Sequence, residues 1–285
     1  MSAKSVSNLP AAPQAPESED RRVDLGLAEP LALRIQGRAE PVPERALVLH
    51  FHGGAFVSGS LDSGAMVRGW LAAAGAVVVS VEYPLAPAQP FPAAIEAGHA
   101  ALLWAARQRT KLAGPRARLF VAGEEAGANL AAALALVARD RQAPPLAGQI
   151  LLSAMLDPCL GSASVRASQA GAATCPLACG WRAYLHSPCS TEHPYAAPGR
   201  ALRLAGLPPA LLVSAADDPL RDETFAYGRR LQQAGVAVAE CALPGPTGWP
   251  AALLEGAASE PPFAGLVRAR LHEFLASTPA QPAQR

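Results

Sequence analysis

Charged side chains, and lysine in particular, are scarce in this sequence of 285 residues. Asp, Glu, Lys and Arg make up 16% of it, and 24 basic against 23 acidic residues give a formal net charge of +1. Lys4 and Lys111 are the only lysines. A nucleic-acid-binding protein neutralises phosphates with clustered basic residues, so this composition argues against that class and we expect no nucleic-acid partner. Hydrophobic residues reach 51%, which is too apolar for a disordered chain.

Long apolar segments and an even number of cysteines are also missing. The longest apolar runs, such as residues 130–138, fall far short of the ~20 residues that span a bilayer. No apolar core of a signal peptide follows the N-terminus. The five cysteines are an odd number, in a chain too large to need disulfides for stability. We therefore expect no membrane span and a cytoplasmic location.

Four of the five cysteines fall within residues 159–189, with two histidines nearby. Cys175 and Cys179 could share one helix face, but the other spacings match no standard zinc pattern. Small, semi-buried thiols are the simpler interpretation. We expect no metal site and no cofactor.

Short apolar runs alternate with longer helical patterns through most of the chain. The runs at 31–35, 46–51, 76–81, 118–122, 149–153, 210–214 and 236–242 predict strands, and the segments at 66–74, 92–111, 126–139, 222–234 and 262–276 predict helices. This alternation predicts an α/β fold with a mostly parallel central sheet and helices on both faces.

The composition also predicts where the domain begins and ends. Residues 1–22 are rich in Pro, Ala and Ser and then charged, which is typical of a disordered tail. We expect one α/β domain over residues 23–277 and a flexible C-terminal tail over 278–285. Residues 158–200 interrupt the alternation with Gly, Ser, Cys and Pro, so we expect a small excursion from the sheet there. Apolar residues at helical spacing in this excursion indicate packing against the body, or alternatively a pocket wall (Leu177, Trp181, Tyr184 and Leu185).

Three loops that follow predicted strands carry the candidate chemistry, because parallel α/β sheets place their sites at the carboxyl ends of the strands. In residues 50–56 (HFHGGAF), two glycines let backbone N–H groups turn into a site. Residues 123–130 (GEEAGANL) form a strand–turn–helix in which two glycines flank a glutamate. Residues 216–223 (ADDPLRDE) place two carboxylates after a third strand.

Together these motifs resemble the hormone-sensitive-lipase-like branch of α/β hydrolases, the bacterial family IV esterases. The resemblance covers about residues 30–276. It is carried by 52–56 (HGGAF), 83–87 (YPLAP, similar to Y-R-L-A-P), 91–94 (FPAA), 123–130 (similar to G-D-S-A-G-G-N-L), 194–198 (PYAAP), 206–209 (GLPP) and 218–223 (DPLRDE). It implies an α/β-hydrolase fold with a small, reduced cap built from the excursion at 158–200.

The resemblance also implies roles for individual residues. The backbone N–H groups of the oxyanion hole would come from Gly53, Gly54 and Ala126. The motif residues that shape these loops would be His52, Gly123 and Gly127.

The sequence departs from the family at two of the three catalytic positions. Glu125 stands where G-x-S-x-G has its serine, and Thr247 stands where the family has its histidine in G-x-x-H-G-F. Asp218 keeps the position of the triad acid, with Asp217 beside it. Ester hydrolysis by this route needs a nucleophile and an imidazole. In a serine hydrolase the loss of either one costs about 10⁶ in kcat.

On these residues we expect a pseudoenzyme, inactive as a serine esterase, that binds a small molecule or a partner protein. The resemblance allows this, because some relatives that lost triad residues act as ligand receptors. Glu125 is expected to accept hydrogen bonds from Gly53, Gly54 and Ala126 and to fill the place of an oxyanion. A neutral or cationic small-molecule ligand would then be favoured.

Two other hypotheses stay open at this point. The first is an enzyme that uses the carboxylates of Glu125 and Asp218 for acid–base or covalent chemistry. The second is a scaffold that forms a homodimer through its last strand and terminal helix, as members of the family often do.

Overall fold

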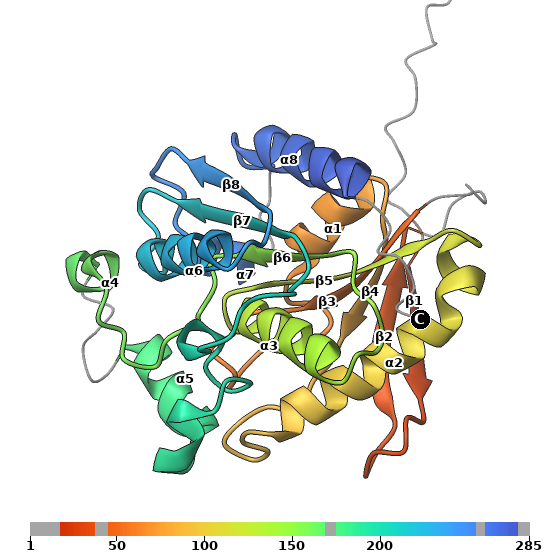
Figure 1. Ribbon diagram of the computed structural model, residues 1–285, viewed down its shortest axis with the longest axis horizontal. Helices are drawn as coiled ribbons and strands as arrows, with labels where there is room; N and C mark the ends of the chain where they lie inside the picture. The colour runs from red at the N-terminus through yellow and green to blue at the C-terminus, as the bar shows by residue number, and fades with distance from the viewer. Residues whose placement is uncertain (1–17, 38–44, 169–174, 255–259, 279–285) are drawn as a thin grey trace, which may run out of the picture.

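An eight-stranded sheet forms the centre of the computed structural model, which describes residues 18–37, 45–168, 175–254 and 260–278. The strand order is β1-β2-β4-β3-β5-β6-β7-β8 (Figure 1). The strands β3 to β8 run parallel, whereas β1 and β2 pair antiparallel at one edge. Their bounds are β1 (Ser18–Val23), β2 (Leu31–Gln36), β3 (Ala46–Phe51), β4 (Val77–Val81), β5 (Arg118–Glu124), β6 (Gly148–Leu152), β7 (Ala210–Ala215) and β8 (Val238–Leu243).

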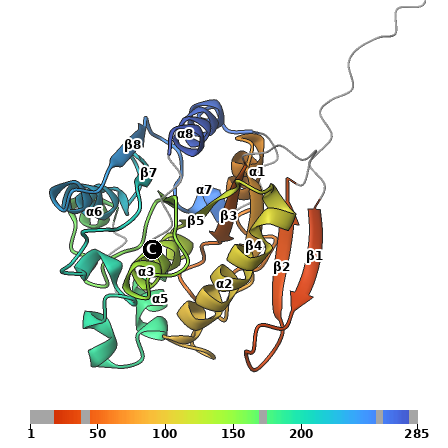
Figure 2. The same ribbon diagram turned by 45° about the vertical axis from the view of Figure 1, so that its right-hand side comes forward.

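Helices cover both faces of this sheet, as predicted (Figures 1 and 2). One face packs against α2 (Ala93–Ala113), α3 (Ala126–Asp140) and α6 (Arg221–Gln233), and the other against α1 (Ala65–Ala73) and α8 (Ala264–Ser277). The short α7 (Ala251–Leu254) precedes α8. Strands buried on both faces read as continuous apolar runs, which is why the run at 46–51 could be recognised. The prediction of an α/β-hydrolase fold is confirmed.

The predicted boundary of the N-terminal tail is wrong at its end. Ser18–Val23 form β1, which pairs antiparallel with β2 from Ser18↔Gln36 to Val23↔Leu31 (Figure 2). The charged residues of this edge strand are ordered, and one of them, Asp20, forms an ion pair with Arg34 of β2 at 2.6 Å. Residues 1–17 and 279–285 of the predicted tails lie outside the described residues.

The excursion at 158–200 contains short helices, which are α4 (Ala163–Ala167), α5 (Pro176–Tyr184), η1 (Pro188–Glu192) and η2 (Pro198–Arg200). Two rings of α5 pack on Phe56, with centroid distances of 5.2 Å from Trp181 and 3.9 Å from Tyr184. The apolar stripe of this segment therefore packs against the loop that follows β3.

Within the described ranges, no helix combines the length and the apolar character needed to cross a membrane.

Candidate active site

The turn between β5 and α3 places Glu125 at the carboxyl edge of the sheet. Glu125 has φ 54° and ψ −113°, a backbone conformation that costs energy for a residue with a side chain. The two flanking glycines permit the turn. A Cβ on Gly123 would lie 2.3 Å from the backbone of Gly127, and one on Gly127 would lie 2.0 Å from the carbonyl oxygen of Phe51. At both positions strand and helix approach too closely for a larger residue.

Three backbone N–H groups converge on the carboxylate of Glu125. Its Oε2 atom accepts hydrogen bonds from the N–H groups of Gly54 at 2.5 Å, Ala55 at 2.7 Å and Ala126 at 3.1 Å. The side chain is buried, with 2% of its surface exposed. This cradle is the arrangement that binds a developing negative charge in acyl transfer. In this structure the carboxylate of Glu125 itself occupies it.

One predicted member of the oxyanion hole lies outside the cradle. The N–H group of Gly53 donates to Oε1 of Glu124 at 3.2 Å, and Ala55 supplies the donor that was expected from Gly53. The reason is the direction of the loop, because Gly54 has φ 115° and turns the following peptide toward Glu125. A motif defines which segment approaches the site but not which peptide plane faces it.

A buried polar chain that the sequence analysis did not identify holds the loop from behind. The Nε2 atom of His50 lies 2.8 Å from Oε2 of Glu124, and its Nδ1 atom lies 3.0 Å from the hydroxyl of Ser80. His50 and Glu124 are fully buried. Because Glu124 also binds the N–H group of Gly53, this chain fixes the start of the loop that carries the donors. The sequence feature that could have indicated this buried chain is His50, a histidine inside the otherwise apolar run at 46–51.

His52 belongs to the same scaffold. Its Nδ1–H donates to the carbonyl oxygen of Gly53 at 2.7 Å, and its ring stacks on Tyr83 with centroids 4.4 Å apart. The hydroxyl of Tyr83 donates to the carbonyl oxygen of His52 at 2.8 Å. Burial lowers the pKa of His52, so the imidazole is neutral around pH 7.

Two opposing effects act on the pKa of Glu125. Burial raises it, and the N–H groups of Ala55, Gly54 and Ala126 lower it by stabilising the charged form. The negative charge of Glu124 adds a smaller increase. The net result is a pKa above the ordinary value of a glutamate, so this carboxylate takes up a proton more readily than an exposed one.

At the carboxyl end of β7, the two neighbouring aspartates point to different partners. Asp217 accepts hydrogen bonds from the N–H group of Thr247 at 2.6 Å and from its hydroxyl at 2.9 Å, and from the N–H group of Gly248 at 2.8 Å. Despite the opposing effect of burial, these donors lower the pKa of Asp217. The structure therefore brings Asp217, and not Asp218, to Thr247, the residue predicted to stand at the histidine position.

Asp218 is turned inward. It accepts hydrogen bonds from the hydroxyl of Ser214 at 2.5 Å and from the N–H group of Leu220 at 2.8 Å. Burial raises its pKa, and these two donors oppose the increase. In the part of the chain that the structure describes, no hydrogen bond joins Glu125 to Asp218 or to Thr247. Three predicted site residues thus lie in separate hydrogen-bond networks.

No group of three or more His, Cys, Asp or Glu side chains in the described ranges is arranged to hold a metal ion.

Known proteins share both the sequence and the fold. Residues 48–246 match the family described as alpha/beta hydrolase fold. Esterase LipI of Mycobacterium tuberculosis is 40% identical over 247 residues, which are 82% of this chain and 75% of LipI. Carboxylesterase NlhH of the same organism is 37% identical over 199 residues, which are 67% of this chain and 62% of NlhH. The crystal structure of a thermostable esterase from Pseudomonas putida has a TM-score of 0.82 and 30% identity, covering 94% of this chain and 85% of that one.

These relatives overturn the expectation of a catalytically silent pseudo-hydrolase. The two relatives at 37–40% identity are named esterase and carboxylesterase, and so is the solved structure of the same fold. They support an ester hydrolase and do not show the loss of a catalytic serine. The assignment of Glu125, Asp218 and Thr247 to the three triad positions stays a prediction. By the matched family, the identities and the shared fold, the chain belongs to the hormone-sensitive-lipase-like esterase branch of the α/β-hydrolase superfamily.

Proposed function

We propose that this chain is a carboxylic ester hydrolase whose site is the cradle around Glu125. The observation that carries the proposal is the convergence of the N–H groups of Gly54, Ala55 and Ala126 on one carboxylate at the strand–helix turn. Such preorganised donors stabilise the oxyanion of acyl transfer. The names of the relatives support the same class of substrate. An ester is neutral, which fits a cradle that already holds one negative charge.

The group available for proton transfer at the cradle is Glu125, and a carboxylate can act as a general base toward water. In the proposed step, a water molecule attacks the acyl carbon of the ester while one of its protons passes to Glu125. The carbonyl oxygen becomes an oxyanion. The tetrahedral intermediate then re-forms the carbonyl and expels the alcohol oxygen, which takes the proton from Glu125. The products are a carboxylic acid and an alcohol, and no covalent enzyme intermediate forms.

The charge of the cradle stays at minus one throughout this step. Before the reaction the charge lies on Glu125, and after proton transfer it lies on the oxyanion of the substrate. A neutral carboxylic acid binds N–H donors more weakly than a carboxylate does, so Gly54 and Ala55 become available to the oxyanion. Burial raises the pKa of Glu125, which favours this proton uptake near neutral pH.

The structure also limits how fast such an enzyme can be. A general base contributes about 10²–10⁴-fold, whereas the loss of the serine or histidine of a serine hydrolase costs about 10⁶ in kcat. We therefore expect slow turnover.

Hydrolysis of p-nitrophenyl acetate by the full chain tests this function. Glu125→Gln keeps the shape of the side chain and removes the base, and Glu29→Gln, at an exposed glutamate between β1 and β2, is the matched control. We expect saturable turnover in the wild type and the control, and a loss of about 10²-fold or more in Glu125→Gln. Turnover in the wild type no faster than in buffer, or equal turnover in Glu125→Gln, would refute the proposal.

Two predictions on the setting of the enzyme remain untested, namely a cytoplasmic location and a homodimer through β8 and α8. The strand β8 is the last in the strand order, so in the described residues its outer edge pairs with no further strand. This supports an edge-to-edge contact between two copies. Sedimentation analysis decides the second prediction, because a monomer at micromolar concentration excludes the dimer.

A further inference from the structure

A cavity lies between α2, the end of α3 and residues 193–195. Its volume is about 510 Å³, within the range of sites for small molecules. The helix α3 runs for 15 residues from the turn at Glu125 to Asp140, a length of about 22 Å at the rise of an α-helix. Val137 near the end of α3 and Arg141 just after it line the cavity, and α2 and α3 pack side by side (Figures 1 and 2). Glu125 and the donors of its cradle are not among the residues that line this cavity.

Aromatic rings form one wall of this cavity. The centroid of His193 lies 5.2 Å from that of Phe91 and 5.1 Å from that of Tyr195, so the three rings make a continuous surface. The buried side chains of Ile95 and Val137 also line the cavity. These surfaces suit a flat, apolar ring of a ligand.

The cavity also contains a guanidinium that no carboxylate neutralises. Nη1 of Arg141 donates to Nδ1 of His99 at 3.0 Å, and an imidazole that accepts a hydrogen bond there is neutral. Burial and the nearby Arg141 both lower the pKa of His99, so it remains uncharged at neutral pH. Among the described residues, no acidic side chain lies within ion-pair distance of Arg141. Arg141 thus lines the cavity with a positive charge that is not paired with a carboxylate of the described residues.

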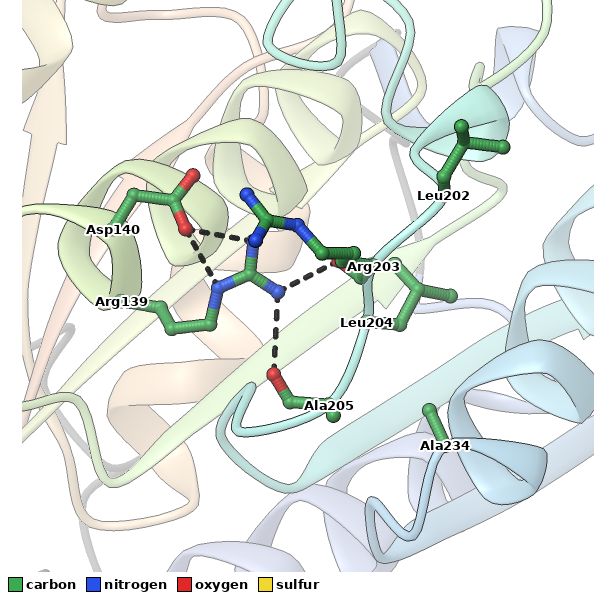
Figure 3. A pocket seen from close by; sticks show the side chains of 7 residues that line it. All are labelled: Arg139, Asp140, Leu202, Arg203, Leu204, Ala205 and Ala234. Carbon is green, nitrogen blue, oxygen red and sulfur yellow. Dashed lines mark hydrogen bonds and ion pairs between the residues drawn. The ribbon is translucent and has the colours of Figure 1, made fainter.

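The nearest acidic side chain in the sequence is already engaged. Asp140 forms an ion pair with Arg139 at 2.8 Å and accepts a hydrogen bond from the hydroxyl of Tyr195 at 2.8 Å. Figure 3 shows Asp140 bound to Arg139 in the neighbouring hollow, which Arg203 and Leu202 also line. Asp140 therefore fixes the ring of Tyr195 in the cavity wall and leaves Arg141 available for a ligand.

We propose that this cavity binds a small aromatic carboxylate. The carboxylate group pairs with the guanidinium of Arg141, whose planar fork matches its geometry. The ring of the ligand lies against Phe91, His193 and Tyr195. Among the described residues, Glu96 is the one acidic residue that lines the cavity, and its negative charge opposes the ligand, so it tunes the affinity. This binding does not depend on whether the chain hydrolyses esters.

Calorimetric titration of the full chain with sodium benzoate tests the proposal, with benzamide as the neutral probe of the same shape and acetate as the carboxylate without a ring. We expect saturable binding of benzoate that is at least 10-fold tighter than that of benzamide or acetate. Arg141→Gln should weaken the binding of benzoate by about 10- to 100-fold, as expected for the loss of a charged hydrogen bond. Arg107→Gln, an exposed arginine on α2 outside the cavity, should leave it unchanged.

The variant Glu96→Gln gives a prediction of the opposite sign. Removal of the opposing charge should tighten the binding of benzoate, which a general loss of structure could not do. Arg141 and Glu96 are both exposed, so their variants should fold normally. The proposal is overturned if benzoate does not saturate, if Arg141→Gln binds it like the wild type, or if Glu96→Gln binds it more weakly.

Discussion

The double substitution Glu125→Ser with Thr247→His tests how closely the loops around Glu125 approach a serine-esterase arrangement. A serine at position 125 would leave the N–H groups of Gly54, Ala55 and Ala126 free to bind an oxyanion. An imidazole at position 247 would meet an acid, because Asp217 already holds the backbone and side chain of that residue at 2.6 and 2.9 Å. The two changes therefore supply a nucleophile beside the N–H donors of the cradle and a base beside the carboxylate of Asp217.

The expected gain follows from the cooperativity of such sites. Loss of the serine or the histidine alone costs a serine hydrolase about 10⁶ in kcat, so each single variant should gain nothing. Glu125→Ser alone should be slower than the wild type, since it removes the proposed base. Because the rest of the pocket is not optimised, we expect the double variant to recover only part of that factor. A gain of about 10²-fold in kcat/KM over the wild type corresponds to about 2.7 kcal/mol of transition-state stabilisation.

The assay is the initial rate of p-nitrophenolate release from p-nitrophenyl acetate for the wild type, both single variants and the double variant. A covalent acyl-enzyme forms only with the serine, so a burst of product should appear in the double variant alone. A double variant no faster than the better single variant would refute the reasoning that positions 125, 217 and 247 surround one reaction centre.

Three other predictions concern the scaffold. Gly127→Ala should lower the free energy of unfolding by about 1–3 kcal/mol or more, because its Cβ would lie 2.0 Å from the carbonyl oxygen of Phe51. Gly161→Ala, with nothing within 4 Å of its Cβ, is the control in chemical denaturation, and equal losses would contradict the packing argument. Glu124→Ala should destabilise by about 3–5 kcal/mol, since it leaves His50 and the N–H group of Gly53 unpaired in the core. An unchanged midpoint in urea would show that this buried chain does not support the loop. Burial raises the pKa of Glu125, so its contribution to stability is present below about pH 4.5 and is lost as the pH rises through its pKa in the folded state. The difference in unfolding temperature, Glu125→Gln minus wild type, should therefore be larger at pH 8 than at pH 4. A larger difference at pH 4 would contradict a raised pKa.

Apolar periodicity and glycine spacing were enough to predict most of the fold. The run at 46–51 became β3 with the same bounds, because all six of its residues are buried between two helical layers and five of them are apolar. The edge strand β1 escaped prediction because its residues are charged and exposed. Its stability comes from pairing with β2 and from the ion pair of Asp20 with Arg34, which no local pattern reveals.

The candidate site was predictable at the level of loops and not at the level of single groups. The family motifs placed Glu125 at the turn correctly, but the orientation of one peptide plane decided that Ala55 and not Gly53 donates to it. Similarly, Asp217 and Asp218 are neighbours in the sequence, and only the inward hydrogen bonds to Asp218 leave Asp217 as the partner of residue 247. In both cases tertiary contacts decide which of two nearby residues in the sequence faces the site.

The most direct test of the central claim is the pH dependence of kcat/KM for p-nitrophenyl acetate in the wild type and in Glu125→Gln. If Glu125 is the general base, the wild-type rate rises through a single ionisation whose pKa lies above the ordinary glutamate value of 4.5, because burial raises it. That ionisation should vanish in Glu125→Gln, with a rate at least about 10²-fold lower on the plateau. The same profile and the same plateau in both proteins would contradict the claim that this carboxylate carries the reaction.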